Sequence, residues 1–403
     1  MSGGRAGGAA GGQAVSGERR AGVWPAGRLL AFRLPRPAVS GLVRLRVLLV
    51  WPVLALLAFA VFCLAVGAGA GDITLTPGEL LPALWGRGEP ATLFLVHELR
   101  LPRAVVAALA GAAFGMAGAL FQAITRNPLA SPDMLGITQG AGTAVVAAIV
   151  LGTGQAASGT GTAQAVSGAG QAASGGFLSD LGALGDLLAG LSTQALGLIG
   201  ALAAGLLIYA LAWNRGTTGY RIVLVGIGVS WICVSITYYL LSRAEQYQAA
   251  RALGWLVGNL NDRGWAHARP LALALVVLVP AALLLTRHQR TLQLGDEVAR
   301  SLGVPVQRAR MALLLCGCAL AAFATAAAGP VLFVALAAPQ VARRLTGAPM
   351  PPLTASAFTG ATLVVVSDLV SQRLLTDSVL PVGVVTGVLG APFLLWHLSR
   401  AKV

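Results

Sequence analysis

The stretch AVVAALAGAAFGMAGALFQAIT, residues 104–125, decides the fold, because it carries no charged side chain over a length that can cross the hydrocarbon of a bilayer. Similar apolar runs occur at residues 47–66, 271–285, 311–328 and 379–398. The whole chain of 403 residues is 56% hydrophobic and only 10% charged, which is far more apolar than a soluble domain of ordinary composition. Few amphipathic segments could cover these runs in a soluble core. The sequence therefore predicts an all-α integral membrane protein.

A polytopic bundle of about ten transmembrane helices is expected within a membrane domain that covers residues 46–400. The expected spans are residues 47–66, 103–125, 134–152, 192–213, 221–242, 268–286, 309–329, 330–342, 354–373 and 379–398. The span at 330–342 is short, so we expect it to be tilted or buried.

Three segments outside the spans have distinct compositions. Residues 1–45 are rich in Gly, Ala and Arg and lack an apolar stretch long enough for the core of a signal peptide, which predicts a disordered cytoplasmic tail. Residues 153–180 are mostly Gly, Ala, Ser, Thr and Gln, a composition typical of a flexible loop, which we expect on the external side. Residues 243–265 combine Trp255 and Trp265 with polar side chains, which predicts an interfacial segment that includes a short helix.

The positive charges indicate the orientation. With the N-terminus inside, 17 Lys and Arg residues lie near the inner ends of the spans and eight near the outer ends. This asymmetry predicts a multi-pass protein of the cell (plasma or inner) membrane with both termini in the cytoplasm. It also accounts for most of the net charge of +14, which in a soluble protein would suggest nucleic acid; no nucleic-acid partner is expected here.

Several kinds of chemistry are not expected of this chain. The four cysteines lie inside apolar runs, and no pair of the four histidines has metal-ligand spacing on a helix, so neither a disulfide framework nor a metal site is predicted. A P-loop needs a lysine before Ser or Thr, whereas the only lysine, Lys402, precedes Val403. The spans hold no Ser, His or paired-Asp arrangement typical of an enzyme. We therefore expect no catalytic residue and no bound cofactor, and energy must come from a partner or an ion gradient.

The second span carries the most distinctive residues. Two arginines in Arg100-Leu-Pro-Arg103 precede it, glycines at 111, 115 and 118 form a small-residue face that permits close helix approach, and Asn127-Pro128 ends the helix. Between the sixth and seventh spans, the acidic pair Asp296-Glu297 stands where a helix N-terminus prefers acid, and Gly303 and Pro305 follow. This pattern predicts a short cytoplasmic helix within a loop that covers residues 287–307.

These residues, together with further motifs, resemble the FecCD-type permease family of ABC importers for iron-siderophores, haem and cobalamin. The matching motifs are Arg100-Leu-Pro-Arg103, Arg126-Asn-Pro-Leu-Ala130, Leu135-Gly136, Leu294 to Gly303, Gly329-Pro-Val-Leu-Phe333, Pro339 with Arg343, Asp368, Leu380-Pro-Val-Gly383 and Gly390-Ala-Pro-Phe393. The similarity extends in order over roughly residues 45–400. The chain departs from the usual pattern at Ala335, where the family usually has Gly, and at Gln340, where it usually has His.

The resemblance implies a permease subunit that translocates an iron(III)-siderophore or related chelate. Its expected partners are a second permease subunit (an identical chain or a paralogue), two cytoplasmic ATPase subunits that hold ATP and Mg, an external substrate-binding lipoprotein and membrane lipid. The fifth span would contribute to the pathway. The 287–307 loop would couple to the ATPase through Gly295, Asp296, Glu297, Ala299, Leu302 and Gly303.

Three outer arginines are assigned to docking of the binding protein by the same resemblance, namely Arg100, Arg103 and Arg373. Their external position works against the positive-inside bias, which suggests a specific use. The alternative is that they reach lipid phosphates or pair with Glu98, Asp368 and Asp377. The remaining motif residues are read as structural: Asn127, Pro128, Gly136, Gly329, Pro330, Pro339, Arg343, Asp368, Pro381, Gly383, Gly390 and Pro392.

Two other functions remain open from the residues alone. An ion-coupled secondary transporter would be expected to carry an ionisable residue near the middle of the membrane, and Asp368 is the main candidate. Its place towards the outer end of its span, near Arg373, fits a structural ion pair better. The other alternative is a membrane scaffold or an intramembrane enzyme.

Overall fold

The computed structural model describes residues 29–34, 39–69, 75–151, 192–213, 219–373 and 380–399, so the loop expected at 153–180 lies outside the described residues. The chain divides into two compact units, residues 1–49 and 50–403. The first unit contains an antiparallel hairpin of β1 (Leu29–Leu34) and β2 (Val39–Arg44), in which Leu29 is opposite Arg44. The hairpin falls in the tail predicted to be disordered. It includes Phe32, Val39 and Val43, residue types that favour strands.

The remainder of the described chain is helical, as predicted. The long helices are α1 (Leu45–Gly67), α4 (Leu101–Thr125), α5 (Ile137–Val150), α7 (Thr193–Ala212), α8 (Gly219–Arg243), α10 (Trp265–Leu292), α12 (Val306–Ala328), α13 (Val334–Thr346), α14 (Leu353–Arg373) and α15 (Val382–Ser399). Each of the ten expected spans coincides with one of them. In the described chain, seven helices are long and apolar enough to cross a membrane; α5 and α15 are shorter apolar helices, and α13 is short and largely buried, as expected.

Shorter helices connect the long ones. They are α2 (Pro77–Leu84), α3 (Pro90–Phe94), the π-helix η1 (Leu95–Arg100), α9 (Gln246–Leu256) and α11 (Asp296–Ser301). The sequence predicted α9 and α11 but not the first three. A signal for α2 was present, because Thr76 and Glu79 form a capping box and Pro77 occupies the first helical position.

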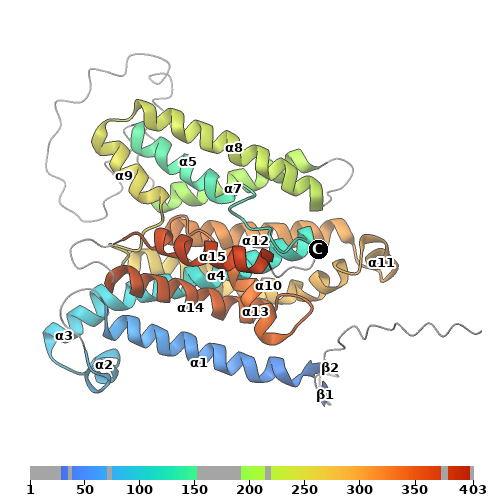
Figure 1. Ribbon diagram of the computed structural model, residues 1–403, viewed down its shortest axis with the longest axis horizontal. Helices are drawn as coiled ribbons and strands as arrows, with labels where there is room; N and C mark the ends of the chain where they lie inside the picture. The colour runs from blue at the N-terminus through green and yellow to red at the C-terminus, as the bar shows by residue number, and fades with distance from the viewer. Residues whose placement is uncertain are drawn as a thin grey trace, which may run out of the picture. The chain divides into compact units, whose positions relative to one another are not determined.

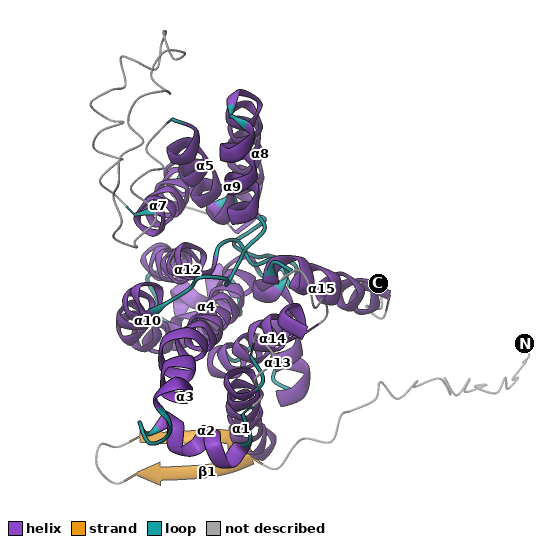
Figure 2. Cartoon of the chain, turned by 90° about the vertical axis from the view of Figure 1, so that its left-hand side faces the viewer, coloured by secondary structure: helices purple, strands orange, loops and turns teal. Residues whose placement is uncertain are grey.

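Helix α4 lies at the centre of the second unit, where it packs against α10, α12, α13 and α14 (Figures 1 and 2). Helices α5, α7, α8 and α9 form a neighbouring group, in which α5 and α7 contact α12 and α8 contacts α4. We call the two ends of this unit the α11 end and the η1 end, after the short helices found there.

The glycines of α4 bring its backbone directly against neighbouring backbones. A Cβ atom on Gly111 would collide with the carbonyl of Gly360 on α14, and one on Gly118 would collide with the carbonyl of Ala335 on α13. Gly115 meets the carbonyl of Ser356 in the same way. The small-residue face predicted from the sequence therefore serves close helix approach, which is a common mode of helix association in membranes.

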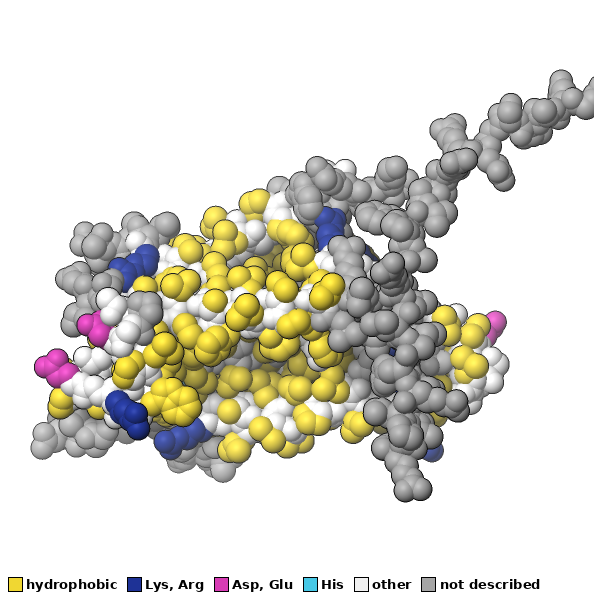
Figure 3. Space-filling model, turned by 90° about the horizontal axis from the view of Figure 1, so that it is seen from below, with side chains coloured by type: hydrophobic (Ala, Val, Ile, Leu, Met, Phe, Trp, Pro, Cys, Tyr) yellow, Lys and Arg dark blue, Asp and Glu magenta, His cyan; other side chains and the backbone are white. Residues whose placement is uncertain are grey.

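The outer surface of the second unit matches a lipid environment. Large apolar side chains of α10 are exposed, among them Leu273, Val276 and Leu284. In Figure 3, hydrophobic side chains cover the middle of the face shown, and charged side chains lie towards its ends. An exposed apolar belt of this kind is stable in hydrocarbon rather than in water.

Three glycines join separate segments at the η1 end. Gly258 follows α9, Gly329 follows α12, and Gly383 lies in the first turn of α15. Gly383 N–H donates to the carbonyl of Gly258 at 3.1 Å, and Asn259 N–H donates to the carbonyl of Ala328 at 3.1 Å. Gly258 and Gly329 have φ angles of +76° and +75°, and a Cβ on any of the three glycines would meet neighbouring backbone atoms. Only glycine fits this junction.

Candidate functional site

Helix α11 is a short helix that lies between two glycines, both of which have positive φ angles. Gly295 precedes it with a φ of +109°, and Gly303 follows it with a φ of +77°. Neither position is crowded, so the backbone angle and not space requires glycine there. The α10–α12 connection thus contains the short helix that the sequence predicted.

Asp296 fastens α11 to two long helices. Its carboxylate accepts a hydrogen bond from Arg126, at the end of α4, at 2.6 Å, and from Arg310, on α12, at 2.9 Å. Arg126 also donates to the carbonyl of Leu292, the last residue of α10. Burial raises the pKa of Asp296, but the hydrogen bonds and charges of Arg310 and Arg126 outweigh burial and hold that pKa below its usual value.

The other side of α11 presents apolar side chains to the surroundings. Leu294, Val298 and Leu302 are 61%, 45% and 61% exposed, whereas Ala299 is buried against the bundle. Glu297 is also exposed. A helix that is fastened by one face and that exposes a valine on another, with an exposed leucine just before and just after it, has the form of a docking element.

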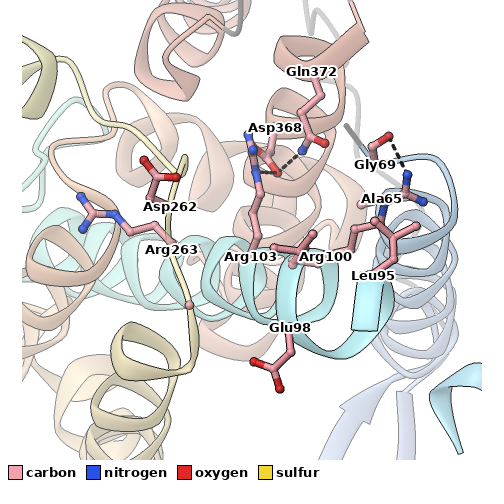
Figure 4. A pocket seen from close by; sticks show the side chains of 13 residues that line it. Ala65, Gly69, Leu95, Glu98, Arg100, Arg103, Asp262, Arg263, Asp368 and Gln372 are labelled. Atoms are coloured by element: carbon pink, nitrogen blue, oxygen red, sulfur yellow. Dashed lines mark hydrogen bonds and ion pairs between the residues drawn. The ribbon is translucent and has the colours of Figure 1, made fainter. Parts of the chain in front are cut away.

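At the η1 end, a cavity of about 440 Å³ opens between five segments (Figure 4). Its walls come from the end of α1, η1, the start of α4, the α9–α10 connection and α14. Six charged residues line it: Glu98, Arg100, Arg103, Asp262, Arg263 and Asp368. Among the described lining residues, the three positive and three negative formal charges balance.

Arg100 closes the C-terminal end of α1. Its guanidinium donates to the carbonyls of Val66, Gly67 and Gly69 at 3.3, 2.9 and 3.4 Å. The residue is only 6% exposed. A cation that satisfies the last carbonyls of a helix also interacts favourably with the helix dipole. Arg100 therefore has an intramolecular role, and its burial leaves little of it for contact with another protein.

Arg103 and Asp368 form a buried, forked ion pair between α4 and α14. Arg103 Nη2 lies 2.7 Å and Nε 3.1 Å from Asp368 Oδ1, and Gln372 donates to Oδ2 at 2.7 Å (Figure 4). The sequence had placed Asp368 in a structural pair near Arg373. The pair exists with Arg103 as the partner, which agrees with the alternative that the outer arginines pair with Asp368; Arg103 lies on another helix and comes near through packing.

Arg373 is the exposed member of the three outer arginines. Its Nε donates to the carbonyl of Ala68 at 2.9 Å, which adds a second arginine to the end of α1. Unlike Arg100 and Arg103, Arg373 remains exposed. It is therefore the member of this set best placed to meet another protein.

The remaining motif residues occupy three places. Asn127 and Pro128 form the turn after α4, where Asn127 Oδ1 accepts from the N–H of Leu129, and Gly136 begins α5 with a φ of +83°. Pro339 and Arg343 lie on α13 near this turn. The α12–α13 connection contains Gly329 and Pro330. Pro381 precedes α15, and α15 itself contains Gly383, Gly390 and Pro392.

Two contributors were not singled out from the sequence. Arg310 is 4% exposed and pairs with Asp296, and its position in an otherwise apolar span was the available signal. Gln122, 4% exposed on α4, donates to the carbonyl of Leu336 and accepts from Gln340. A glutamine inside a span is an equally unusual residue.

Helix α8 presents a face of mixed character. Trp231 and Tyr238 are 67% and 69% exposed on one stripe of the helix. Ser235 lies between them on this stripe, and Gly228 lies one turn before Trp231. Only four residues of α8 are buried. Hydroxyl groups and glycine on an exposed stripe differ from the aliphatic side chains that suit lipid, which indicates a surface that meets protein or a polar pathway.

No group of three or more His, Cys, Asp or Glu side chains that could hold a metal ion occurs among the described residues. Among the described carboxylates, Asp296 and Asp368 pair with arginines instead.

Comparison with known proteins places the chain in a family. The model of the FecCD transport family matches residues 56–400. The chain is 37% identical over 341 residues to the permease protein of the ferric enterobactin transport system of Escherichia coli, covering 83% of this chain and 92% of that protein. It is 34% identical over 356 residues to the permease protein of the iron(3+)-hydroxamate import system of Bacillus subtilis, and the match covers 88% of this chain and 98% of that protein.

A solved structure has the same fold. It is a metal-chelate type ABC transporter in an inward-facing conformation, with a TM-score of 0.68 and 20% identity, covering 88% of this chain and 99% of that one. Together with the family match over most of the chain, these relationships establish that the chain belongs to the FecCD transport family.

Proposed function

We propose that this chain is the membrane-spanning permease subunit of an ABC importer that carries an iron(III)-siderophore or a related metal chelate into the cytoplasm. The observation that carries the proposal is α11, which exposes Leu294, Val298 and Leu302 and is tied through Asp296 to α4 and α12. Such an element can receive force from a cytoplasmic ATPase and pass it to the spans. The relatives named above are permease proteins of iron-chelate systems, which supports the same reading.

The chain itself supplies the pathway and not the chemistry of energy conversion. It has no P-loop lysine, so ATP and Mg belong to partner ATPase subunits. A second permease subunit would complete the pathway, and the stripe of α8 with Trp231, Ser235 and Tyr238 is the surface we assign to it. The chelate would cross as a unit, held weakly by hydroxyl, glycine and aromatic groups.

The decisive experiment separates ATP from an ion gradient as the energy source. Proteoliposomes that contain the permease, its ATPase and the loaded binding protein should accumulate the ferric chelate when ATP is present on the ATPase side. A proton gradient without ATP should give no uptake. Uptake that persists without ATP in the presence of that gradient would establish the secondary transporter instead.

The orientation follows from the charge asymmetry of 17 to eight. Both termini and the α11 end are assigned to the cytoplasm, and residue 165 to the external side. A single cysteine placed at residue 165, in a chain freed of its native cysteines, should react with an impermeant thiol reagent in intact cells. Labelling that appears only after lysis would reverse the orientation.

Arg373 is the arginine to which we assign contact with an acidic surface of the external binding protein. Arg373→Glu should slow association of the loaded binding protein about tenfold at low salt, because exposed charges act mainly on the association rate. The difference should shrink above 0.1 M salt, where the screening length falls to ~10 Å. Arg87→Glu is a matched control, since Arg87 is exposed on the same side but is not one of the three motif arginines. Equal association rates in both variants would remove Arg373 from the docking surface.

A further inference from the structure

A second cavity, of about 180 Å³, lies at the α11 end. Its walls come from the end of α4, the turn after it, the end of α10, helix α13 and the α13–α14 connection. The lining residues are Gln122, Arg126, Pro128, Gln293, Gln340, Arg343, Pro349 and Pro351. At about 30 Å³ for each water in the liquid, the cavity has room for about six waters, or for one small polar group.

The described lining of this cavity is positively charged, and only one of its two arginines, Arg126, is paired with a carboxylate. Among the described residues that line it, Arg126 and Arg343 are the charged ones, and none of the others carries a carboxylate. The nearest acid in the network, Asp296, is already shared by Arg126 and Arg310. The half-buried side chain of Arg343 has no hydrogen bond or ion pair with any residue that the structure describes. A half-buried guanidinium without a partner is costly, which favours an anion beside it.

Two buried glutamines add a fixed acceptor to the lining. Gln122 Nε2 donates to the carbonyl of Leu336, which leaves Gln122 Oε1 to accept from Gln340 Nε2. Gln340 Nε2 also donates to the carbonyl of Pro128 at 3.1 Å. These contacts determine which way both amides point. Gln340 is 1% exposed, and its Oε1 has no partner within the described chain. A ligand that satisfied it would need a hydrogen-bond donor.

We propose that this cavity binds a phosphate group together with a hydroxyl donor, with the phosphate oxygens on Arg343 and Arg126 and the hydroxyl, of the phosphate itself or of a glycerol attached to it, donating to Gln340 Oε1. Arginine forks match phosphate oxygens, and basic pockets between transmembrane helices on the cytoplasmic side suit anionic headgroups. The group comes either from the headgroup of phosphatidylglycerol or from a free phosphate. Gln340 stands where the family usually has histidine, so the acceptor is a feature of this chain.

The bound phosphate would join α13 to the turn that holds α11, because Arg126 contacts both the cavity and Asp296. Occupancy would thereby stiffen the link between the docking helix and the centre of the bundle. This consequence rests on the proposed importer function. The binding itself does not, because it is measured on the permease without siderophore or ATP.

The test measures ligand retention by the purified permease. Native mass spectrometry after extraction, and titration in nanodiscs of phosphatidylglycerol or of phosphatidylcholine, report the lipid; calorimetric titration with inorganic phosphate reports the free anion. Arg343→Gln should weaken binding about fivefold or more, and Gln340→Leu should weaken phosphatidylglycerol more than inorganic phosphate. Arg308→Gln is the matched control, because Arg308 is an exposed arginine at the same end but outside the cavity lining. This variant should bind phosphatidylglycerol and phosphate as the wild type does.

The lipid and phosphate measurements distinguish phosphatidylglycerol from free phosphate, and both from the absence of binding. Retention of phosphatidylglycerol that is lost in Arg343→Gln identifies the lipid, and saturable phosphate binding lost in that variant identifies the free anion. If Arg343→Gln does not fold, ligand binding by Arg343→Lys and by Gln340→Leu is compared with that of the wild type instead. Absence of both ligands from the wild type, or unchanged binding in the cavity variants, overturns the proposal. The proposal is also overturned if the cavity variants weaken association with the ATPase but leave ligand binding unchanged, because an acidic side chain of the partner would then fill the cavity.

Discussion

Asp296→Ala should separate ATP hydrolysis from transport. The substitution removes the carboxylate that joins α11 to Arg126 on α4 and to Arg310 on α12. Helix α11 would keep its exposed Leu294, Val298 and Leu302 and could still bind a partner. Its movement would no longer be passed to the two long helices. Chelate transported per ATP hydrolysed should fall about tenfold, within the range of typical coupling free energies.

Glu297→Ala is the matched control for this prediction. Glu297 is the neighbouring acid on the same docking helix, but it is exposed and pairs with no described arginine, so its removal should weaken ATPase binding without lowering the chelate transported per ATP hydrolysed. Glu297→Arg reverses a charge on the docking face, and Gly303→Val strains a backbone with a φ of +77°; both should weaken binding of the ATPase. If Asp296→Ala transports with the stoichiometry of the wild type at equal expression, the network around Asp296 does not transmit force.

Breaking the Arg103–Asp368 pair should produce the largest loss of stability. Asp368→Leu would leave Arg103 without its carboxylate, and Arg103→Met would leave Asp368 charged and buried. Removal of one partner of a buried pair costs about 3 kcal/mol or more, because the remaining charge is uncompensated. Each single variant should therefore unfold at a clearly lower temperature in detergent, measured by the fluorescence of the eight tryptophans.

The double variant Arg103→Met with Asp368→Leu should recover most of this stability, because apolar side chains of similar size often replace a buried ion pair at little cost. It also decides the role of Arg103. If the arginine serves only the fold, the double variant binds the loaded binding protein at the wild-type rate. A stable double variant with slow association would return Arg103 to the docking surface, and a double variant no more stable than the singles would contradict the ion-pair argument.

The spans could be predicted from the sequence because bilayer thickness fixes how long an apolar run must be. Even the short span at 330–342 corresponds to a helix, α13, although its bounds shift to Val334–Thr346. The start of α13 was misplaced because Gly329 and Phe333 adopt φ angles of +75° and +64°, which turn the chain before the helix begins. Such local backbone angles leave little trace in hydrophobicity.

The outer arginines show why site geometry was harder to predict. Arg100 and Arg103 are three residues apart in one motif, yet the first closes the end of α1 and the second pairs with Asp368 on α14. The π-helix η1 ends at Arg100, whereas Arg103 lies in the first turn of α4, so the two arginines belong to different helical segments. The family resemblance assigned both to one docking surface, with pairing to Asp368 as an alternative, whereas packing partners more than thirty and two hundred residues away decide their positions.

The junction of Gly258, Gly329 and Gly383 has a mechanical consequence. Side chains can absorb small displacements between helices by changing rotamer, but here backbone meets backbone and no side chain intervenes. A shift of α9 therefore cannot be taken up locally, and the ends of α12 and the start of α15 must travel with it. The amides of Asn259 and Gly383, which bridge these segments, should then exchange their hydrogens with solvent at the same rate, as members of one cooperative opening unit.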